Sequence, residues 1–218
     1  LLVGATDMGT GCDTILAQMA AECLECELEE IVVHGVDTDI SPYDCGSYAS
    51  STTYVTGMAV LKTCESLKKK ICERGAEYMG CDVADVEFDG ENVINLKTGE
   101  SISRRDIGNR VMCFSNAPLS ASEAFSSPVS PPPFMVGIAE VEIDKETGEI
   151  ELIDYVAVVD CGTVVNPNLA RVQVEGGIAQ GIGMALYEDV VYNEKGKNFS
   201  NSLMQYKIPT RADIGRIR

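Results

Sequence analysis

The chain has 218 residues, of which 45% are hydrophobic and 23% charged, the balance of a globular protein large enough for one or two domains. Acidic residues outnumber basic ones by 34 to 17, and the net charge of −17 argues against binding to nucleic acid or to an anionic membrane, since both need a basic surface. No apolar run is long enough for a transmembrane helix. Residues 1–4 resemble the middle of a strand and not a signal peptide, so we expect a piece of a longer, cytoplasmic polypeptide.

The first quarter of the chain predicts a strand, a turn and a helix. A strand ends at residues 1–4, and a glycine-containing turn follows over 7–11. Apolar residues then repeat at helical spacing up to Leu24, with Asp13 or a neighbour as the cap. Residues 31–33 predict a short buried strand, and residues 35–50 a polar loop.

A long helix and a hairpin come next. The helix has one apolar stripe, made by Gly57, Val60, Cys64, Leu67 and Ile71. Residues 84–95 predict a hairpin with a turn at Asp89-Gly90. Ser103 and Asp106 have the spacing of a capping box that opens a helix containing Ile107, Val111 and Phe114.

The second half begins with a proline-rich stretch. Two strands follow at about 134–144 and 149–160, then a helix from Asn166-Pro167 to Tyr187 and a last strand near 189–193. The fold class is therefore α+β, with mixed sheets packed with helices. We divide the chain into a first α/β segment (1–114), a proline-rich connection (115–133) and a second strand–helix segment (134–218).

Two predicted helix starts suit an anion. Gly9-Thr10-Gly11 leads into one helix, and the serine- and threonine-rich residues 47–53 lead into the other. Helix N-termini offer free amides and partial positive charge, and the Ser50, Thr52 and Thr53 hydroxyls add donors. Residues 1–61 contain no lysine or arginine, so an anion here would be held by neutral donors. The alternative is that these residues only cap a helix and shape a turn.

A glycine-dense helix is the second unusual feature. Gly176, Gly177, Gly181 and Gly183 lie in one helical pattern, where each costs about 0.8–1 kcal/mol relative to alanine. Such a pattern indicates close approach of backbone by a ligand or by another helix, and both remain open. Gln173 and Gln180 are seven residues apart and share a face.

Other site classes lack their residues. His34 is the only histidine, which excludes a histidine-rich metal site, and we interpret it as a structural residue at a strand end. The pair Cys23 and Cys26 lacks a second pair, so we expect nine reduced thiols. Asp37 and Asp39 provide too few ligands for a cation loop.

Taken together, the motifs resemble a known family, the molybdenum-binding subunits of the xanthine dehydrogenase, aldehyde oxidase, carbon monoxide dehydrogenase and nicotinate dehydrogenase family. The motifs that carry the resemblance occur in this order: Asp7-Met8-Gly9-Thr10-Gly11, Asp37-Thr38-Asp39 to Pro42, Ser47-Tyr48-Ala49-Ser50, Asn166-Pro167, Gln173-Val174-Glu175-Gly176-Gly177, Gln180-Gly181-Ile182-Gly183 and Tyr206-Lys207-Ile208-Pro209.

The resemblance implies a molybdopterin cofactor whose molybdenum is bound by the pterin dithiolene and not by side chains. Gln173 would hydrogen-bond the pterin, Ser50, Thr52 and Thr53 its phosphate or dinucleotide end, and Ala49 would lie near the metal. Gly9 and Gly11 would let the backbone approach the cofactor. Thr10 stands where the family usually has glutamine, and its shorter side chain puts that contact in question.

The resemblance also implies that this chain is a fragment of an oxidoreductase that hydroxylates a heterocycle or aldehyde carbon with oxygen from water. The family's catalytic glutamate lies in a Gly-Glu-Pro-Pro segment after Tyr206-Lys207-Ile208-Pro209, so no catalytic residue is assigned here and the chain alone is expected to be inactive. Expected partners are the remaining molybdenum-subunit segments, iron–sulfur and flavin (FAD) subunits or domains, and a small-molecule substrate. The cytosine dinucleotide form of the cofactor stays open, as does the alternative of a non-catalytic anion-binding, nucleotide-binding or assembly module.

Overall fold

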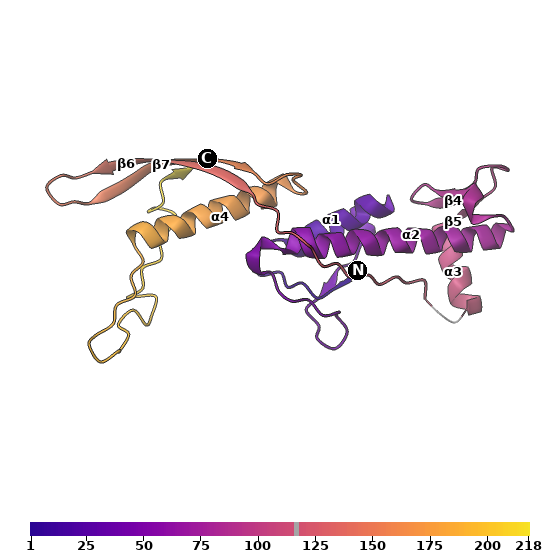
Figure 1. Ribbon diagram of the computed structural model, residues 1–218, viewed down its shortest axis with the longest axis horizontal. Helices are drawn as coiled ribbons and strands as arrows, with labels where there is room; N and C mark the ends of the chain where they lie inside the picture. Colours follow the sequence, from indigo (N-terminus) through magenta and orange to yellow (C-terminus); the bar gives the residue numbers. More distant parts are fainter. Residues whose placement is uncertain (116–117) are drawn as a thin grey trace. The chain divides into compact units, whose positions relative to one another are not determined.

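The computed structural model describes residues 1–115 and 118–218, which form two compact units, Leu1–Val129 and Ser130–Arg218. The first unit combines helices with two small sheets and the second packs one helix on a three-stranded sheet, so the α+β prediction is confirmed (Figure 1). The predicted connection at 115–133 includes residues 116–117, which lie outside the described residues. Residues 118–133 contain no regular helix or strand.

The first unit opens with a minimal parallel sheet and a helix. β1 (Leu2–Val3) pairs with β2 (His34–Gly35), and α1 (Cys12–Leu24) and the 3-10 turn η1 (Leu28–Glu30) lie between them. The predicted strand at 31–33 is wrong. Val32 is 75% exposed, because pairing with β1 begins only at His34. Where the strand begins is therefore determined by pairing with β1, and not by the β-propensity of Ile31-Val32-Val33.

Two helices pack in parallel along this unit. The 3-10 turn η2 (Tyr48–Ser50) and the π-helical turn η3 (Thr52–Thr56) lead into α2 (Gly57–Met79). Met19 lies against Gly57, the Cys23 thiol points to the Leu61 carbonyl oxygen at 3.9 Å, and Lys68 pairs with Glu25 at 2.5 Å. Residue numbers rise together on both helices, so their N-terminal ends lie at the same end of the pair (Figure 1).

A satellite core covers the second half of α2. β3 (Val86–Phe88), β4 (Asn92–Asn95) and β5 (Ser101–Ser103) form an antiparallel meander, preceded by the 3-10 turn η4 (Val83–Asp85) and followed by α3 (Arg104–Ser115). Val93 and Ile107 are fully buried between them. The predicted hairpin is confirmed, whereas β5 was not predicted.

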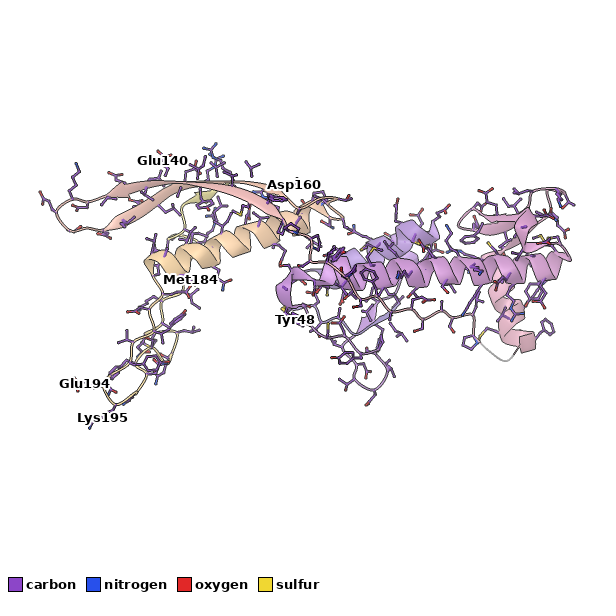
Figure 2. All side chains as sticks on the ribbon, in the orientation of Figure 1. Tyr48, Glu140, Asp160, Met184, Glu194 and Lys195 are labelled. Carbon is purple, nitrogen blue, oxygen red and sulfur yellow. The ribbon has the colours of Figure 1, made fainter. Side chains whose placement is uncertain are left out.

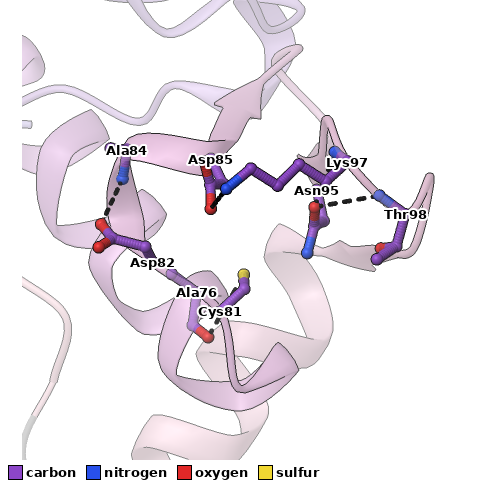
Figure 3. Close-up of polar contacts among 8 residues, drawn as sticks. All are labelled: Ala76, Cys81, Asp82, Ala84, Asp85, Asn95, Lys97 and Thr98. Atoms are coloured by element: carbon purple, nitrogen blue, oxygen red, sulfur yellow. Dashed lines mark hydrogen bonds and ion pairs between the residues drawn. The ribbon is translucent and has the colours of Figure 1, made fainter.

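Polar contacts fix the turns of this meander (Figure 3). Asp82 caps η4 by accepting from the Ala84 amide at 2.9 Å, Lys97 pairs with Asp85 at 2.5 Å, and Asn95 accepts from the Thr98 amide at 3.2 Å. Ser103 caps α3 as predicted, since the Asp106 amide donates to Ser103 Oγ at 3.0 Å, but the Ser103 hydroxyl, and not its amide, donates to the Asp106 carboxylate, so the capping box is incomplete. At the far end of α3, Phe114 is 83% exposed and is not a core residue.

The second unit is a long hairpin with one helix on it. β6 (Phe134–Ile143) and β7 (Ile150–Asp160) are antiparallel, and β8 (Arg216–Ile217) pairs in parallel with β7. α4 (Pro167–Leu186) packs on the sheet through Ile178, Ile182 and Leu152. Asn166 caps α4 as predicted, accepting from the Asn168 and Leu169 amides.

The predicted strand at 189–193 is wrong. Only Tyr192 makes a ladder contact there, an isolated bridge to Asn198. The position next to β7 is taken by β8, whose Ile217 packs into the core with α4. Residues 189–193 therefore form no strand of this sheet, and β8 supplies its third strand.

Among the described residues, no helix has the length and apolar character needed to cross a membrane.

Candidate functional site

The entrance to α2 has an unusual backbone. Ala49 and Ser50 both have positive φ angles, 55° and 56°, although neither is glycine. This conformation costs roughly 1–2 kcal/mol per residue and concentrates at functional sites. Ser51 then returns to the right-handed helical region, and the chain enters a π-helical turn before α2. Successive residues of opposite hand direct their amides to one side, which forms an anion-binding concavity.

This entrance is open and rich in unused donors. Ala49, Ser50 and Thr53 are exposed and Thr52 is half-buried, and Figure 2 marks the neighbouring Tyr48, which is 67% exposed. The hydroxyls of Ser50, Thr52 and Thr53 make no hydrogen bond within the described part of the chain. By contrast, Ser51 and Thr56 donate to the Tyr48 carbonyl and to Asp44. The three predicted hydroxyls therefore remain available.

The start of α1 is built differently. The N-cap is Gly11, with φ 76° and no side-chain cap, so the predicted capping by Asp13 is wrong. Instead, Asp7 Oδ1 accepts from the Gly9 amide at 2.9 Å and the Gly11 amide at 3.1 Å. Gly9 has φ 103°, and a Cβ placed there would meet no atom within 4 Å, so the turn presents bare backbone to the outside.

Two carboxylates that hold these loops were not predicted. Asp7 organises the Gly9–Gly11 turn, while Asp44 accepts from the Gly46 amide at 2.8 Å and the Thr56 hydroxyl at 3.0 Å. Asp44 thereby ties the loop before η2 to the start of α2. An aspartate two residues before a turn glycine is a local signal that could have identified both.

The loops of the first unit share one end of the helix pair. α1 and α2 run in parallel, and α1 also contacts η3. The Gly9–Gly11 turn and the Ser50–Thr53 entrance consequently lie at the N-terminal ends of adjacent helices. The structure brings together seven of the eight predicted cofactor-binding residues on this unit, namely Gly9, Thr10, Gly11, Ala49, Ser50, Thr52 and Thr53.

Gln173 belongs to the second unit, where it lies on α4. Its side chain is exposed and has no partner among the described residues, as is also the case for Gln180. Glu175, in contrast, accepts from Arg171 at 2.7 Å. At the other end of α4, the Tyr206 hydroxyl donates a hydrogen bond to the Glu188 carboxylate, and Pro209 lies close to Gly183. The motif Tyr206–Pro209 therefore packs against this end of the helix.

The packing explanation for the glycine-dense helix fails at three positions. A Cβ on Gly176, Gly177 or Gly181 would meet no atom within 4 Å among the described residues. Only Gly183 is crowded, by Glu188 and Pro209. Contacts within the described chain thus do not account for the glycines at 176, 177 and 181.

One group of possible metal ligands occurs among the described residues. Asp7, Cys12 and Asp13 approach one another, but the Asp7 carboxylate already accepts from the Gly9 and Gly11 amides, and burial raises the pKa of the Cys12 thiol. All nine cysteines are free thiols, and burial raises the pKa of Cys64 to about 11.

We expect the ionisation of Asp7 to make the stability of the fold depend on pH in the acid range. The Gly9 amide holds the pKa of Asp7 below its usual 3.8, so the folded state favours the carboxylate. This stabilisation is complete above pH 3.8 and is lost as pH falls through the lowered pKa of the folded protein. Thermal unfolding measured between about pH 2 and 6 should show a shallower acid decline for Asp7→Asn than for the unaltered chain. Asp13→Asn is the matched control, and an equal change in both variants contradicts the assignment.

Comparison with known proteins decides the family. A family model described as the molybdopterin cofactor-binding domain matches residues 1–215. The chain belongs to this family.

The chain corresponds to part of much longer relatives. It is 36% identical over 214 residues to the "Probable hypoxanthine oxidase XdhD" of Escherichia coli strain K12, covering 98% of this chain and 22% of the relative. It is 29% identical to the "Putative xanthine dehydrogenase molybdenum-binding subunit XdhA" of the same strain, covering 98% of this chain and 29% of that subunit.

Solved structures agree. The fold matches quinoline 2-oxidoreductase from Pseudomonas putida 86 with a TM-score of 0.83 and 28% identity, covering 98% of this chain and 28% of that one. The resemblance to molybdenum-binding subunits is confirmed, and the chain spans less than a third of the length of these relatives.

Proposed function

We propose that this chain provides part of the molybdopterin site of a molybdenum-dependent oxidoreductase. The observation that carries the proposal is the entrance to α2, where Ala49 and Ser50 have positive φ and the hydroxyls of Ser50, Thr52 and Thr53 have no partner among the described residues. Backbone strain at an exposed turn with many hydrogen-bond donors is expected where the binding of a ligand offsets its energetic cost.

Each loop has a separate task in this proposal. Ser50, Thr52 and Thr53 donate to the phosphate or dinucleotide end of the cofactor, helped by the partial positive charge at the helix start. The bare Gly9–Gly11 turn and Thr10 lie against the pterin, and Ala49 lies near the metal. Gln173 hydrogen-bonds the pterin with its unpaired amide, and the open glycines of α4 allow backbone approach.

The chemistry comes from the cofactor. When bound, a molybdenum pterin supplies oxidation of a substrate carbon with oxygen from water, and its dithiolene carries the metal. The donor set here fits that group, since the hydroxyls of Ser50, Thr52 and Thr53 and the exposed amide of Gln173 are neutral hydrogen-bond donors. The chain's residues bind and orient, and none of them is assigned as the proton acceptor.

The full-length protein is proposed to hydroxylate a heterocycle or an aldehyde. The relative with 36% identity is named a probable hypoxanthine oxidase, which favours a nitrogen heterocycle. Iron–sulfur and FAD subunits or domains would receive the electrons, in a cytoplasmic complex, and the cofactor could carry a cytosine nucleotide. The isolated chain is proposed to be inactive.

Phosphate binding at the α2 entrance can be tested directly. We expect pyrophosphate to shift the amide NMR signals of residues 50–53 in the purified chain. Replacing Ser50, Thr52 and Thr53 together by alanine should weaken this binding about 10- to 100-fold, because hydrogen bonds to a charged group contribute about 1.5–3 kcal/mol each and overlap in effect.

The matched control lies farther along the same helix. Thr63→Ala and Ser66→Ala remove hydroxyls from α2 outside the proposed site and should leave binding unchanged. Absence of shifts at residues 50–53 in the unaltered chain, or equal loss in the control variants, contradicts the phosphate role. Pyrophosphate binding with no molybdenum in the full-length protein would favour the alternative of a plain anion-binding module.

A further inference from the structure

The turn that carries Thr52 and Thr53 has an uncommon backbone geometry. Residues Thr52–Thr56 form the π-helical turn η3, and the Gly57 amide donates to the Thr52 carbonyl oxygen. The Val55 amide donates to the Ser51 carbonyl oxygen at 2.7 Å. π-Helical turns are rare and occur mostly as single turns at functional sites. We therefore looked for contacts from outside the turn that stabilise it.

These contacts come from the last residues of the first unit. Tyr54, in the middle of η3, meets Phe125 edge to face, with the two ring centroids 6.2 Å apart. The Tyr54 hydroxyl is hydrogen-bonded to Ser127 Oγ at 2.8 Å, across 73 positions of the chain. Lys62 Nζ lies 4.8 Å from the centroid of the same Phe125 ring. Residues 125–127 therefore contact the Tyr54 side chain both at its ring and at its polar end.

The segment that provides these contacts is itself fixed. Ser127 Oγ hydrogen-bonds the Val129 carbonyl oxygen and accepts from the Val129 amide at 3.2 Å, which forms a tight turn where the first unit ends. Earlier in the same segment, the Ser120 carbonyl oxygen accepts from Lys70 at 2.7 Å. The segment thus follows α2 toward its N-terminal end, where Tyr54 lies (Figure 1).

We propose that Tyr54 is a positioning residue for the Thr52 and Thr53 hydroxyls, and that Phe125 and Ser127 hold it in place. Tyr54 directly follows Thr53 in the same turn, so a displaced Tyr54 side chain displaces the backbone that carries both hydroxyls. Tyr54 acts only through these two threonines. The inference rests on the proposed function, since it takes their hydroxyls as phosphate donors, but the first part of its test needs no phosphate.

Amide hydrogen exchange of the purified chain tests the positioning itself. The Val55 and Gly57 amides close η3, so their exchange rates report how often the turn opens. Phe125→Ala should speed the exchange of both about tenfold, because it removes the edge-to-face contact and the cation–π contact. Phe125→Tyr keeps the ring and should restore the slow exchange. Unchanged exchange in Phe125→Ala overturns the inference.

Pyrophosphate titration by amide NMR tests the consequence for binding. Phe125→Ala should weaken binding at residues 50–53 about tenfold, and Phe125→Tyr should bind as the unaltered chain does. Lys70→Met is the matched control, since it releases the same segment at Ser120, farther along α2, and should change neither exchange nor binding. Equal weakening in Lys70→Met overturns the proposal. So does a Phe125→Ala chain that unfolds at lower urea concentration but binds pyrophosphate with unchanged affinity, because Phe125 would then serve only stability.

A double variant tests the hydrogen bond between Tyr54 and Ser127. Tyr54→Phe and Ser127→Ala each remove this bond, so each should weaken pyrophosphate binding about threefold, and the double variant should bind no more weakly than either alone. Additive losses would show that the two hydroxyls act separately and would overturn the role of Ser127. Absence of pyrophosphate binding in the unaltered chain contradicts the proposed function, and the exchange of the Val55 and Gly57 amides still decides whether Phe125 positions the turn.

Discussion

Gly90→Ala should lower the free energy of unfolding of the first unit by about 2–5 kcal/mol, from the sum of left-handed backbone strain and overpacking. Gly90 turns the β3–β4 hairpin with φ 93°, and a Cβ there would lie 2.0 Å from the Glu25 carbonyl oxygen at the end of α1. Carbonyl and turn are both backbone, so neither can rotate away. Urea unfolding of the purified chain measures the loss.

Gly99→Ala is the matched control for this turn. Gly99 also has a positive φ, 76°, but a Cβ there would meet no atom within 4 Å. Its cost should be limited to about 1–2 kcal/mol of backbone strain. Equal destabilisation by both substitutions would mean that the contact between the hairpin and α1 contributes nothing.

The triple substitution Gly176→Ala, Gly177→Ala and Gly181→Ala should stabilise the second unit of the isolated chain. Each glycine in a helix costs about 0.8–1 kcal/mol relative to alanine, so the three together should add roughly 2–3 kcal/mol to the free energy of unfolding. No described atom lies where the new methyl groups would go. The same triple variant of the full-length protein should retain less molybdenum, because methyl groups would fill the space into which a ligand approaches.

A more stable isolated chain together with less molybdenum in the full-length protein would indicate that the glycines serve the approach of a ligand and not packing against another helix. Gly183→Ala is the control, since its Cβ would lie 2.2 Å from Glu188 Oε1 and 2.9 Å from Pro209 Cδ, and it should not stabilise the chain. Unfolding by urea and metal analysis give the two readouts. A stabilised isolated chain with unchanged molybdenum content would contradict a role for the open glycines in cofactor binding.

Local chemistry was enough to predict most elements. The apolar stripe of α2, the Asp89-Gly90 turn, the Ser103 cap of α3 and the Asn166-Pro167 start of α4 depend on neighbours within a few residues. Predictions failed where the partner lies far along the chain. Residues 31–33 form no β-ladder pair, although the Val32 carbonyl accepts from the Leu1 amine at 2.9 Å, and the third strand of the second unit's sheet is β8 and not 189–193.

Some features of the candidate site also follow from the sequence alone, and others only from the tertiary structure. The sequence by itself determined which residue types are present: neutral donors at two helix starts, a glutamine beside a glycine-dense helix, and a single histidine. Only the tertiary structure decided that the two helix starts are adjacent, because parallel packing of α1 and α2 aligns them, and that Asp7 accepts from the Gly9 and Gly11 amides before α1. The sequence gives the residue types, but whether a backbone amide is free to bind a ligand depends on whether the fold brings an acceptor oxygen within hydrogen-bonding distance of it.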